Sequence, residues 1–300
     1  MQSGGIDHSA KQTFATSAPA ALVRPRCAVW GVLNVTHDSF SDGGRYLDPR
    51  GAVAHAEALI RQGATVIDIG GASSRPAGQT YGTGAAALSA QQELDRVAPV
   101  IEALRPFGIA LSIDTTQPVV AHGALSLGAR IVNDVSCAGN GELLEVVAAA
   151  GASYVAMHSR GKGEVAPPNT SYREVIDEVV AELLLAVDRA VSHGVAREQI
   201  WLDPGIGFAK TAAQSFEVLA RLERIVELGY PVLVGASRKG FIAEVAPFAD
   251  GQKPAPLERE AGSIAVLTAA VLKGALAVRV HEVVGARQAV LVAERLRGAC

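Results

Sequence analysis

Eight short apolar runs recur along the chain, and each is followed by a segment with helical spacing. The runs cover residues 28–33, 65–70, 109–114, 130–134, 153–158, 199–203, 231–235 and 276–281. They are rich in Val and Ile and lack the polar–apolar alternation of a half-exposed strand. This pattern favours strands of a parallel sheet that is covered on both faces.

The segments between these runs carry helix signals at both ends. Ser89 and Gln92 have the spacing of a capping box, in which each side chain bonds the backbone N–H of the other residue. Apolar residues recur at every fourth position from Val175 to Val191, and Gly194 supplies a stop signal. The sequence therefore predicts helices between the strands.

Strand–helix alternation repeated eight times favours the α/β class and a single-domain (β/α)8 TIM barrel over residues 27–300. A doubly wound open sheet is the alternative. The short gap after the third run leaves room only for a small helix over 118–127. The segment 246–260, with three prolines, predicts a mobile surface loop.

Composition adds limits to this picture. The hydrophobic fraction of 49% indicates a well-filled core, and no apolar run approaches the ~18 residues of a membrane span. Residues 1–26 lack the pattern of a secretory signal, so we expect a disordered leader and a cytoplasmic protein. The three cysteines fit no metal or disulfide spacing. The net charge of −3 gives no reason to expect nucleic acid or a membrane as partner.

Functional side chains stand at the carboxyl end of every predicted strand, where a barrel gathers its active site. A polar residue at one strand end is ordinary, because it can cap the next helix or form a turn. Eight such ends in one barrel predict a shared pocket. The residues at these ends are Asn34, Asp68, Asp114, Asn133, Met157, His158, Asp203, Ser237, Arg238, Lys239, Arg279 and His281.

Part of this set suits a planar heterocycle with amino, ring N–H and carbonyl groups. Asp114 and Asp203 each offer a carboxylate that can accept two parallel N–H bonds from such an edge. Asn133 and Lys239 supply further donors and acceptors. Each residue also has a purely structural interpretation. Asp203, for example, precedes Pro204-Gly205, and its role could be limited to forming a turn.

The remaining residues suit an anion such as phosphate or pyrophosphate. Arg279, His281, Arg238 and Arg75 supply the cations. Asn34 offers a neutral oxygen to Mg²⁺, which often bridges to substrate phosphates and keeps most of its waters. The alternatives are a core histidine at 281 and a solvated pair at 238–239.

Eight ordered motifs resemble one family, the dihydropteroate synthases of the folate pathway, which join a pterin pyrophosphate to p-aminobenzoate. The resemblance runs from about residue 27 to the end of the chain. No single motif is as specific as their order and spacing together. The motifs are GVLNVTHDSFSDGG (31–44), DIGGASSRPAG (68–78), SIDT (112–115), VNDVS (132–136), MHSRG (157–161), LDPGIGFAK (202–210), VGASRKGF (234–241) and RVHEV (279–283).

The resemblance implies a (β/α)8 barrel and assigns roles to residues of this sequence. The pterin would be held by Asp114, Asn133, Asp203 and Lys239, with Asp68, Met157, Phe208 and Gly235 lining its slot. The pyrophosphate would be held by Arg279, His281 and Asn34, with Mg²⁺ at Asn34. The p-aminobenzoate site, where sulfonamides compete in this family, would comprise Ser237, Arg238, Phe40, Ser74 and Pro76.

The resemblance also implies a mechanism without a side-chain nucleophile. Asp114, Lys239, Arg279 and His281 would be the catalytic groups, with Mg²⁺ and Arg75 helping to stabilise the departing pyrophosphate. The segments 34–44 and 70–78 would be two mobile loops that close over the reaction. A homodimer is expected, and the apolar face of 284–295 (Val284, Val290, Leu291, Ala293) would permit it.

The second loop departs from the family pattern. Ala72 stands where an acidic residue is common, and Ser74 replaces the usual Thr. These changes put p-aminobenzoate affinity and sulfonamide sensitivity in question more than the pterin site. The alternatives are therefore a pterin-binding paralogue with weak or no condensing activity, a sulfonamide-tolerant synthase, or a pterin-binding methyltransferase module.

Overall fold

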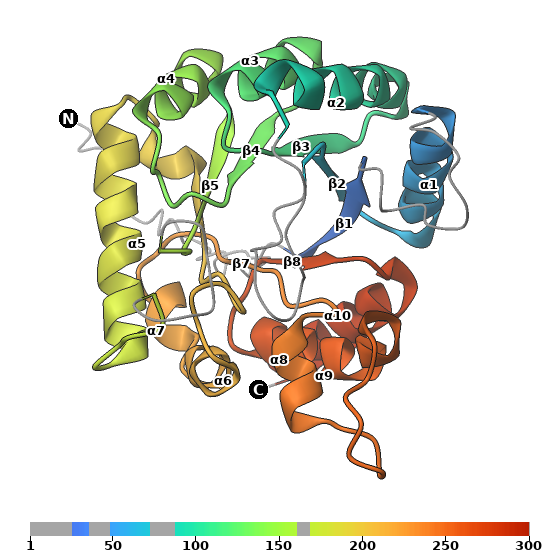
Figure 1. Ribbon diagram of the computed structural model, residues 1–300, viewed down its shortest axis with the longest axis vertical. Helices are drawn as coiled ribbons and strands as arrows, with labels where there is room; N and C mark the ends of the chain where they lie inside the picture. Colours follow the sequence, from blue (N-terminus) through green and yellow to red (C-terminus); the bar gives the residue numbers. More distant parts are fainter. Residues whose placement is uncertain (1–25, 36–48, 73–87, 161–168, 300) are drawn as a thin grey trace, which may run out of the picture.

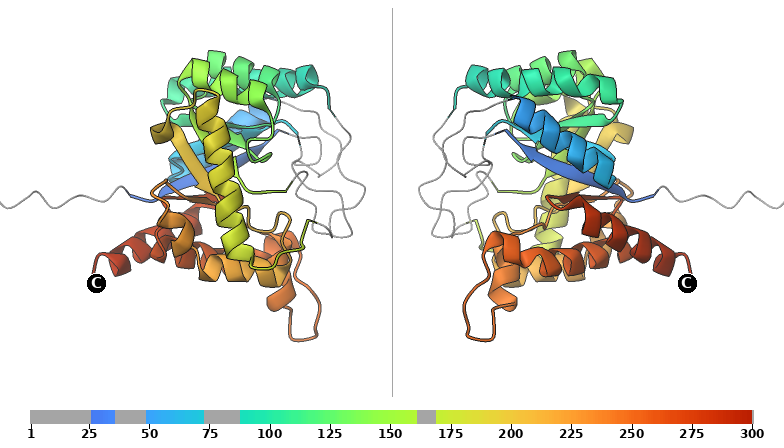
Figure 2. Two further views of the ribbon diagram at one scale, coloured as in Figure 1. Left: turned by 90° about the vertical axis from the view of Figure 1, so that its left-hand side faces the viewer. Right: turned by 90° about the vertical axis from the view of Figure 1, so that its right-hand side faces the viewer.

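The computed structural model describes residues 26–35, 49–72, 88–160 and 169–299. Eight parallel strands form its centre, and the helices lie outside them (Figures 1 and 2). The predicted leader lies, but for residue 26, outside the described residues. The strands are β1 (Ala28–Asn34), β2 (Val66–Gly70), β3 (Ala110–Asp114), β4 (Ile131–Asp134), β5 (Ser153–Met157), β6 (Ile200–Asp203), β7 (Leu233–Val234) and β8 (Ala277–Val280).

The sheet closes on itself, which confirms the predicted barrel and excludes the open sheet. Neighbouring strands follow the order β6-β5-β4-β3-β2-β1-β8-β7. The two remaining edges meet where Leu202 forms a parallel bridge to Val232 and its N–H donates to the Pro231 carbonyl oxygen at 2.9 Å. All eight predicted strands are present, with ends that shift by one or two residues.

The helices surround this barrel. The Ser89 capping box is confirmed: Gln92 N–H donates to Ser89 Oγ at 3.2 Å, and Ser89 N–H donates to Gln92 Oε1 at 3.0 Å. No helix in the described part of the chain is long and apolar enough to cross a membrane. The helices are α1 (Pro49–Gln62), α2 (Ala90–Leu104), α3 (Pro118–Leu127), α4 (Gly141–Ala150), α5 (Val175–Ser192), α6 (Ala212–Ala220), α7 (Glu223–Val226), α8 (Gly240–Val245), α9 (Glu260–Leu272) and α10 (Val283–Arg297).

Two predictions about the last third of the chain need correction. The segment 246–260 lies on the surface, but Pro256–Arg259 forms a 3-10 helix and Glu260 begins α9. Of the apolar face predicted on α10, Val290 and Ala293 are buried in the chain's own core, so they cannot lie in a dimer interface. Val284 and Leu291 are exposed. Half of that face is buried in the core because α10 packs against α9 and β1.

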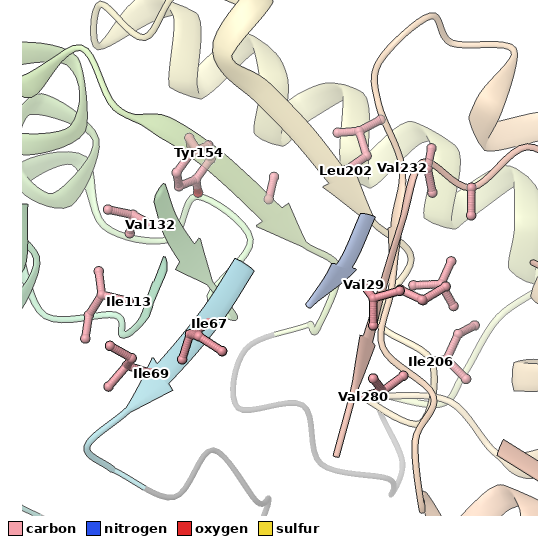
Figure 3. Packing of buried hydrophobic residues seen from close by; sticks show 14 of the residues in the cluster. Val29, Ile67, Ile69, Ile113, Val132, Tyr154, Leu202, Ile206, Val232 and Val280 are labelled. Atoms are coloured by element: carbon pink, nitrogen blue, oxygen red, sulfur yellow. The ribbon is translucent and has the colours of Figure 1, made fainter. Parts of the chain in front are cut away.

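The pleat of the strands separates two apolar clusters. The larger cluster lies between strands and helices and includes Val29, Ile67, Ile113, Leu202 and Val280 (Figure 3). The residues that alternate with these along each strand face the barrel interior, because successive side chains point to opposite faces of the sheet. These interior residues form the smaller cluster, which comprises Trp30, Val66, Val155, Leu233 and Ala277.

The same alternation positions the functional layer. Two residues beyond the members of the interior apolar cluster, the inward-facing positions are Val32 on β1, Asp68 on β2, Met157 on β5, Gly235 after β7 and Arg279 on β8. An apolar layer therefore forms a floor, and the polar residues Asp68 and Arg279 lie above it. This places the predicted site at the carboxyl ends of the strands, as expected for this fold.

Gly205 shows how tightly the turn after β6 is packed. Its φ of +62° lies in the left-handed region, and a Cβ there would lie 1.8 Å from the His158 carbonyl oxygen. Its N–H donates to Asp203 Oδ1 at 2.7 Å. The turn that presents the Asp203 carboxylate therefore requires glycine for two separate reasons.

We expect Gly205→Ala to destabilise the protein far more than Gly108→Ala, by about 3 kcal/mol or more in free energy of unfolding. Gly108 is a matched control because its φ is +65° and a Cβ there would meet nothing within 4 Å. Urea denaturation of both variants measures the difference. Equal losses would show that backbone strain alone, and not the contact with residue 158, requires glycine.

Candidate active site

The structure brings the predicted strand-end residues to one rim of the barrel. Strand register sets Asp114 beside Asn133, and Met157 beside Asp203. The described members of the predicted site are Asn34, Asp68, Asp114, Asn133, Met157, Asp203, Phe208, Gly235, Ser237, Arg238, Lys239, Arg279 and His281. Phe40, Ser74, Arg75 and Pro76, and with them most of both predicted loops, lie outside the described residues.

Arg279 is the hub of the buried polar cluster. Its Nε donates to Asp68 Oδ2 at 2.6 Å, and its Nη2 donates to Asp114 Oδ2 at 2.8 Å. Asn133 Nδ2 also donates to Asp68 Oδ2, at 3.2 Å. One guanidinium from β8 thus joins carboxylates of β2 and β3 across the barrel mouth.

Two acceptors of this cluster lack a partner in the described part of the chain. Asp68 Oδ1 and Asn133 Oδ1 are buried, and neither accepts a hydrogen bond there. Buried polar atoms without a partner are rare, and each one calls for an explanation. A ligand that presents N–H groups between β2 and β4 would supply the missing donors.

The opposite wall of the pocket combines a carboxylate, a cation and an aromatic ring. The Lys239 ammonium donates to the Ile206 carbonyl oxygen and lies 4.5 Å from the centre of the Phe208 ring. A Cβ on Gly235 would lie 3.7 Å from Asp203 Oδ2, so glycine leaves the space beside that oxygen open. Asp203, Lys239 and Phe208 therefore place a carboxylate, a cation and an aromatic ring on this side of the barrel mouth, a set of groups that suits a flat heterocycle.

Burial shifts the pKa of the ionisable groups in the pocket. It raises the pKa of Asp114 to about 7, although Arg279 opposes the shift. Burial likewise raises the pKa of Asp203, against the effect of Lys239, and lowers the pKa of Lys239 to about 8, against the effect of Asp203. For Arg279, burial lowers the pKa, but Asp68 and Asp114 outweigh it and the net shift is upward. Shifts of this kind are typical of functional sites.

A cationic edge lies where β7 and β8 end. The Ser237 hydroxyl accepts the His281 backbone N–H at 3.3 Å and lies 3.1 Å from His281 Nδ1. Arg238 has a φ of +60°, and its Nε donates to Glu260 Oε2 at 3.0 Å. Ser237 and His281, which the resemblance assigns to the p-aminobenzoate and pyrophosphate sites, are thus in contact, while the Arg238 guanidinium is paired with Glu260 of α9.

Asn34 fits a site for Mg²⁺ only as one ligand among several. A Cβ built on Gly70 would lie 3.7 Å from Asn34 Oδ1 and 3.8 Å from Asp114 Cβ. Asn34 and Asp114 therefore face the same space. No group of three His, Cys, Asp or Glu side chains among the described residues could hold a metal. The donor set suits an ion that takes most of its ligands from water and substrate phosphate.

A groove of about 810 Å³ also lies between α3 and α4. Half of its lining residues are small, among them Ala129, Ala149 and Ala150, and it includes none of the predicted site residues. Its charged groups, such as Glu142 and Arg130, are ordinary surface residues. The strand ends, and not this groove, have the chemistry of a ligand site.

The sequence pattern missed one buried polar network next to the pocket. Lys210 is only 1% exposed, and His158 is completely buried beside it. The sequence places His158 at the end of a predicted strand, but nothing in it indicates that Lys210 is buried or that the two side chains are in contact. A lysine inside an otherwise apolar and glycine-rich segment was the only available signal.

A closed (β/α)8 barrel with buried ionisable groups at the carboxyl ends of its strands has the architecture of a barrel enzyme. The chain matches the family "Pterin binding enzyme" over residues 30–281. It is 46% identical over 260 residues to a dihydropteroate synthase of Mycobacterium leprae, covering 85% of this chain and 88% of that protein.

Solved structures give the same result. A Xanthomonas albilineans dihydropteroate synthase with 4-aminobenzoic acid has a TM-score of 0.81 at 38% identity, covering 92% of this chain and 94% of the other. A Yersinia pestis dihydropteroate synthase with a sulfonamide drug has a TM-score of 0.82 at 35% identity, covering 92% and 95%. The chain therefore belongs to the pterin-binding enzymes and, within them, to the dihydropteroate synthase family.

We expect Arg279→Met to cost about 3–5 kcal/mol in free energy of unfolding, because it leaves buried carboxylates without their cation. The loss should grow between about pH 6 and about pH 8.5. Without Arg279 the folded-state pKa of Asp114 rises above its wild-type value of about 7, while the unfolded value stays near 3.9. A group whose pKa is higher in the folded state than in the unfolded state contributes stability that is lost as the pH rises through its folded-state pKa.

Urea denaturation across this pH range measures the effect. Arg279→Met/Asp114→Asn is the matched control, since without the Asp114 carboxyl the pH dependence of the loss should largely disappear. A loss that is the same at every pH, or that persists unchanged in the double variant, would contradict the assigned pairing.

Proposed function

We propose that this chain condenses 6-hydroxymethyl-7,8-dihydropterin pyrophosphate with p-aminobenzoate, giving 7,8-dihydropteroate and pyrophosphate. It is thus a dihydropteroate synthase, a transferase of folate biosynthesis. The observation that carries this proposal is the buried cluster around Arg279, with two acceptors that lack a partner among the described residues. Family membership supports the same reaction.

The pterin occupies the slot between the two walls of the pocket. Its amino and ring N–H groups donate to the free oxygens of Asp68 and Asn133 and to the carboxylates of Asp114 and Asp203. Lys239 donates to the ring carbonyl, and Phe208 packs against the ring face. The apolar floor below excludes water, which strengthens each of these electrostatic contacts.

The reaction separates charge, and the pocket residues follow that separation. The bond between the methylene carbon and the pyrophosphate oxygen breaks, which leaves negative charge on the pyrophosphate and positive charge on the pterin fragment. Arg279 and His281 stabilise the pyrophosphate, while Asp114 stabilises the cationic pterin fragment. Asn34 would hold Mg²⁺, which supplies further positive charge to the phosphate oxygens when bound.

The second substrate attacks from the Ser237–Arg238 edge. The neutral arylamine nitrogen forms the new bond to the methylene carbon and then loses a proton to water or to the departing pyrophosphate. Because the amine is itself the nucleophile, no protein nucleophile is needed. Phe40, Ser74 and Pro76 are proposed to complete this edge, and Arg75 is proposed to help stabilise the departing pyrophosphate. Because the Y. pestis relative binds a sulfonamide drug, we propose that sulfonamides compete here as well.

A homodimer remains a prediction. The exposed apolar residues of α10, which are Val284, Leu291, Val292 and Leu296, would be available to such a contact. Val290 and Ala293 would not, because the core covers them.

The proposal is tested by pyrophosphate release from pterin pyrophosphate, p-aminobenzoate and Mg²⁺ with purified protein. We expect release that requires both substrates and that a sulfonamide inhibits. Pterin binding without release would favour the non-condensing paralogue, which Ala72 in the second loop suggests. Release that a sulfonamide does not inhibit would identify a tolerant synthase.

Asp114→Asn should reduce turnover by about 10²-fold or more and leave the protein folded. The carboxylate is buried at an energetic cost, so its loss should not weaken the fold greatly. Asp95→Asn on the exposed face of α2 is the control, because its carboxylate accepts a hydrogen bond from Gln91 and lies away from the predicted site. Turnover close to that of the control, or an unfolded Asp114→Asn protein, would contradict the assignment.

A further inference from the structure

Lys210 uses every donor of its ammonium group inside the protein. The Nζ atom lies 2.8 Å from His158 Nδ1, 3.2 Å from the Gly205 carbonyl oxygen and 3.1 Å from the Phe208 carbonyl oxygen. Burial lowers the pKa of Lys210 to about 7, with Asp203 opposing, so both protonation states are accessible near neutral pH. Only the charged state has one donor for each of the three acceptors.

His158 extends this contact toward α5. Because Nδ1 accepts from Lys210, the ring must carry its proton on Nε2, which lies 2.9 Å from Glu182 Oε2. Burial lowers the pKa of His158 to about 4, with Lys210 as the second cause, so the ring is neutral at pH 7. Arg160 holds the same Glu182 carboxylate, with Nη2 to Oε1 at 2.6 Å.

The two carbonyl groups held by Lys210 belong to the turn that forms one wall of the pocket. Between Gly205 and Phe208 lies Ile206, whose carbonyl oxygen accepts from Lys239. Phe208 supplies the ring that lies 4.5 Å from the same ammonium. The Lys210 ammonium therefore fixes both backbone segments that set the position of Lys239 and Phe208.

We propose that Lys210, held by His158 and Glu182, is a positioning residue that shapes the pterin-binding wall without touching the substrate. It acts through the 205–208 turn on Lys239 and Phe208. The inference rests on the proposed function only in identifying the pterin as the ring that binds against this wall. It predicts a selective loss of pterin affinity, since the carbonyl groups that Lys210 holds belong to the turn after β6, whereas Ser237 and Arg238 follow β7 and bond His281 and Glu260 instead.

We expect Lys210→Met to raise the KM for pterin pyrophosphate by about 10- to 100-fold and to leave the KM for p-aminobenzoate nearly unchanged. Lys273→Met is the matched control. The Lys273 ammonium also bonds a backbone carbonyl, of Ala220 at 2.9 Å, and a carboxylate, of Glu223 at 2.6 Å, but it does so at the end of α9. This control should leave both KM values unchanged.

A second pair of variants serves if Lys210→Met does not fold. His158→Asn keeps an amide oxygen near the place of Nδ1 and should stay close to the wild-type pterin KM, whereas His158→Leu removes the acceptor and should raise it. An unchanged pterin KM in folded Lys210→Met, an equal rise in both KM values, or equal effects of the two His158 variants would overturn the proposal.

Calorimetric titration with 6-hydroxymethylpterin separates this inference from the proposed function. Asp203→Asn removes a proposed direct contact and should weaken binding. If Asp203→Asn binds as well as wild type, the proposed pterin site is wrong, and this inference fails with it. If Asp203→Asn weakens binding and Lys210→Met does not, the site stands and only the role of Lys210 is wrong.

Discussion

The Arg279 guanidinium, bonded to Asp68 and Asp114 at once, is the interaction on which the site depends. Two carboxylates from β2 and β3 face one buried space, and without a cation between them they would repel each other. The bridge uses only Oδ2 of Asp68, which leaves the other oxygen for a ligand. A single cation thus stabilises both carboxylates.

The barrel makes this cluster possible because strand pleat and closure act together. Because successive side chains of a strand point alternately outward to the helices and inward, the inward-facing floor of Trp30, Val66 and Ala277 lies directly below the inward-facing polar residues. Closure then brings β8 next to β1, two strands from Asp68. The Lys210 network supports the site from the segments that follow β5 and β6.

The strands, the capping box at Ser89 and the small helix 118–127 could be predicted because each depends on local spacing. Convergence of the strand ends followed from the barrel alone. Partners could not be predicted: nothing near Arg238 in the sequence indicates its pairing with Glu260, and nothing near Lys210 indicates His158. The exposed face of α10 was misjudged because spacing shows which residues are apolar but not which of them the core covers.

The geometric claim is tested most directly by a crystal structure of the protein with the pterin pyrophosphate substrate bound. We expect the pterin ring between the Asp68–Asn133 side and the Asp203–Lys239 side, with its N–H groups bonded to Asp68 Oδ1 and Asn133 Oδ1, the acceptors without a partner among the described residues. The pyrophosphate should lie toward Arg279 and His281. A pterin bound outside this slot, or one that leaves both acceptors unpaired, would contradict it.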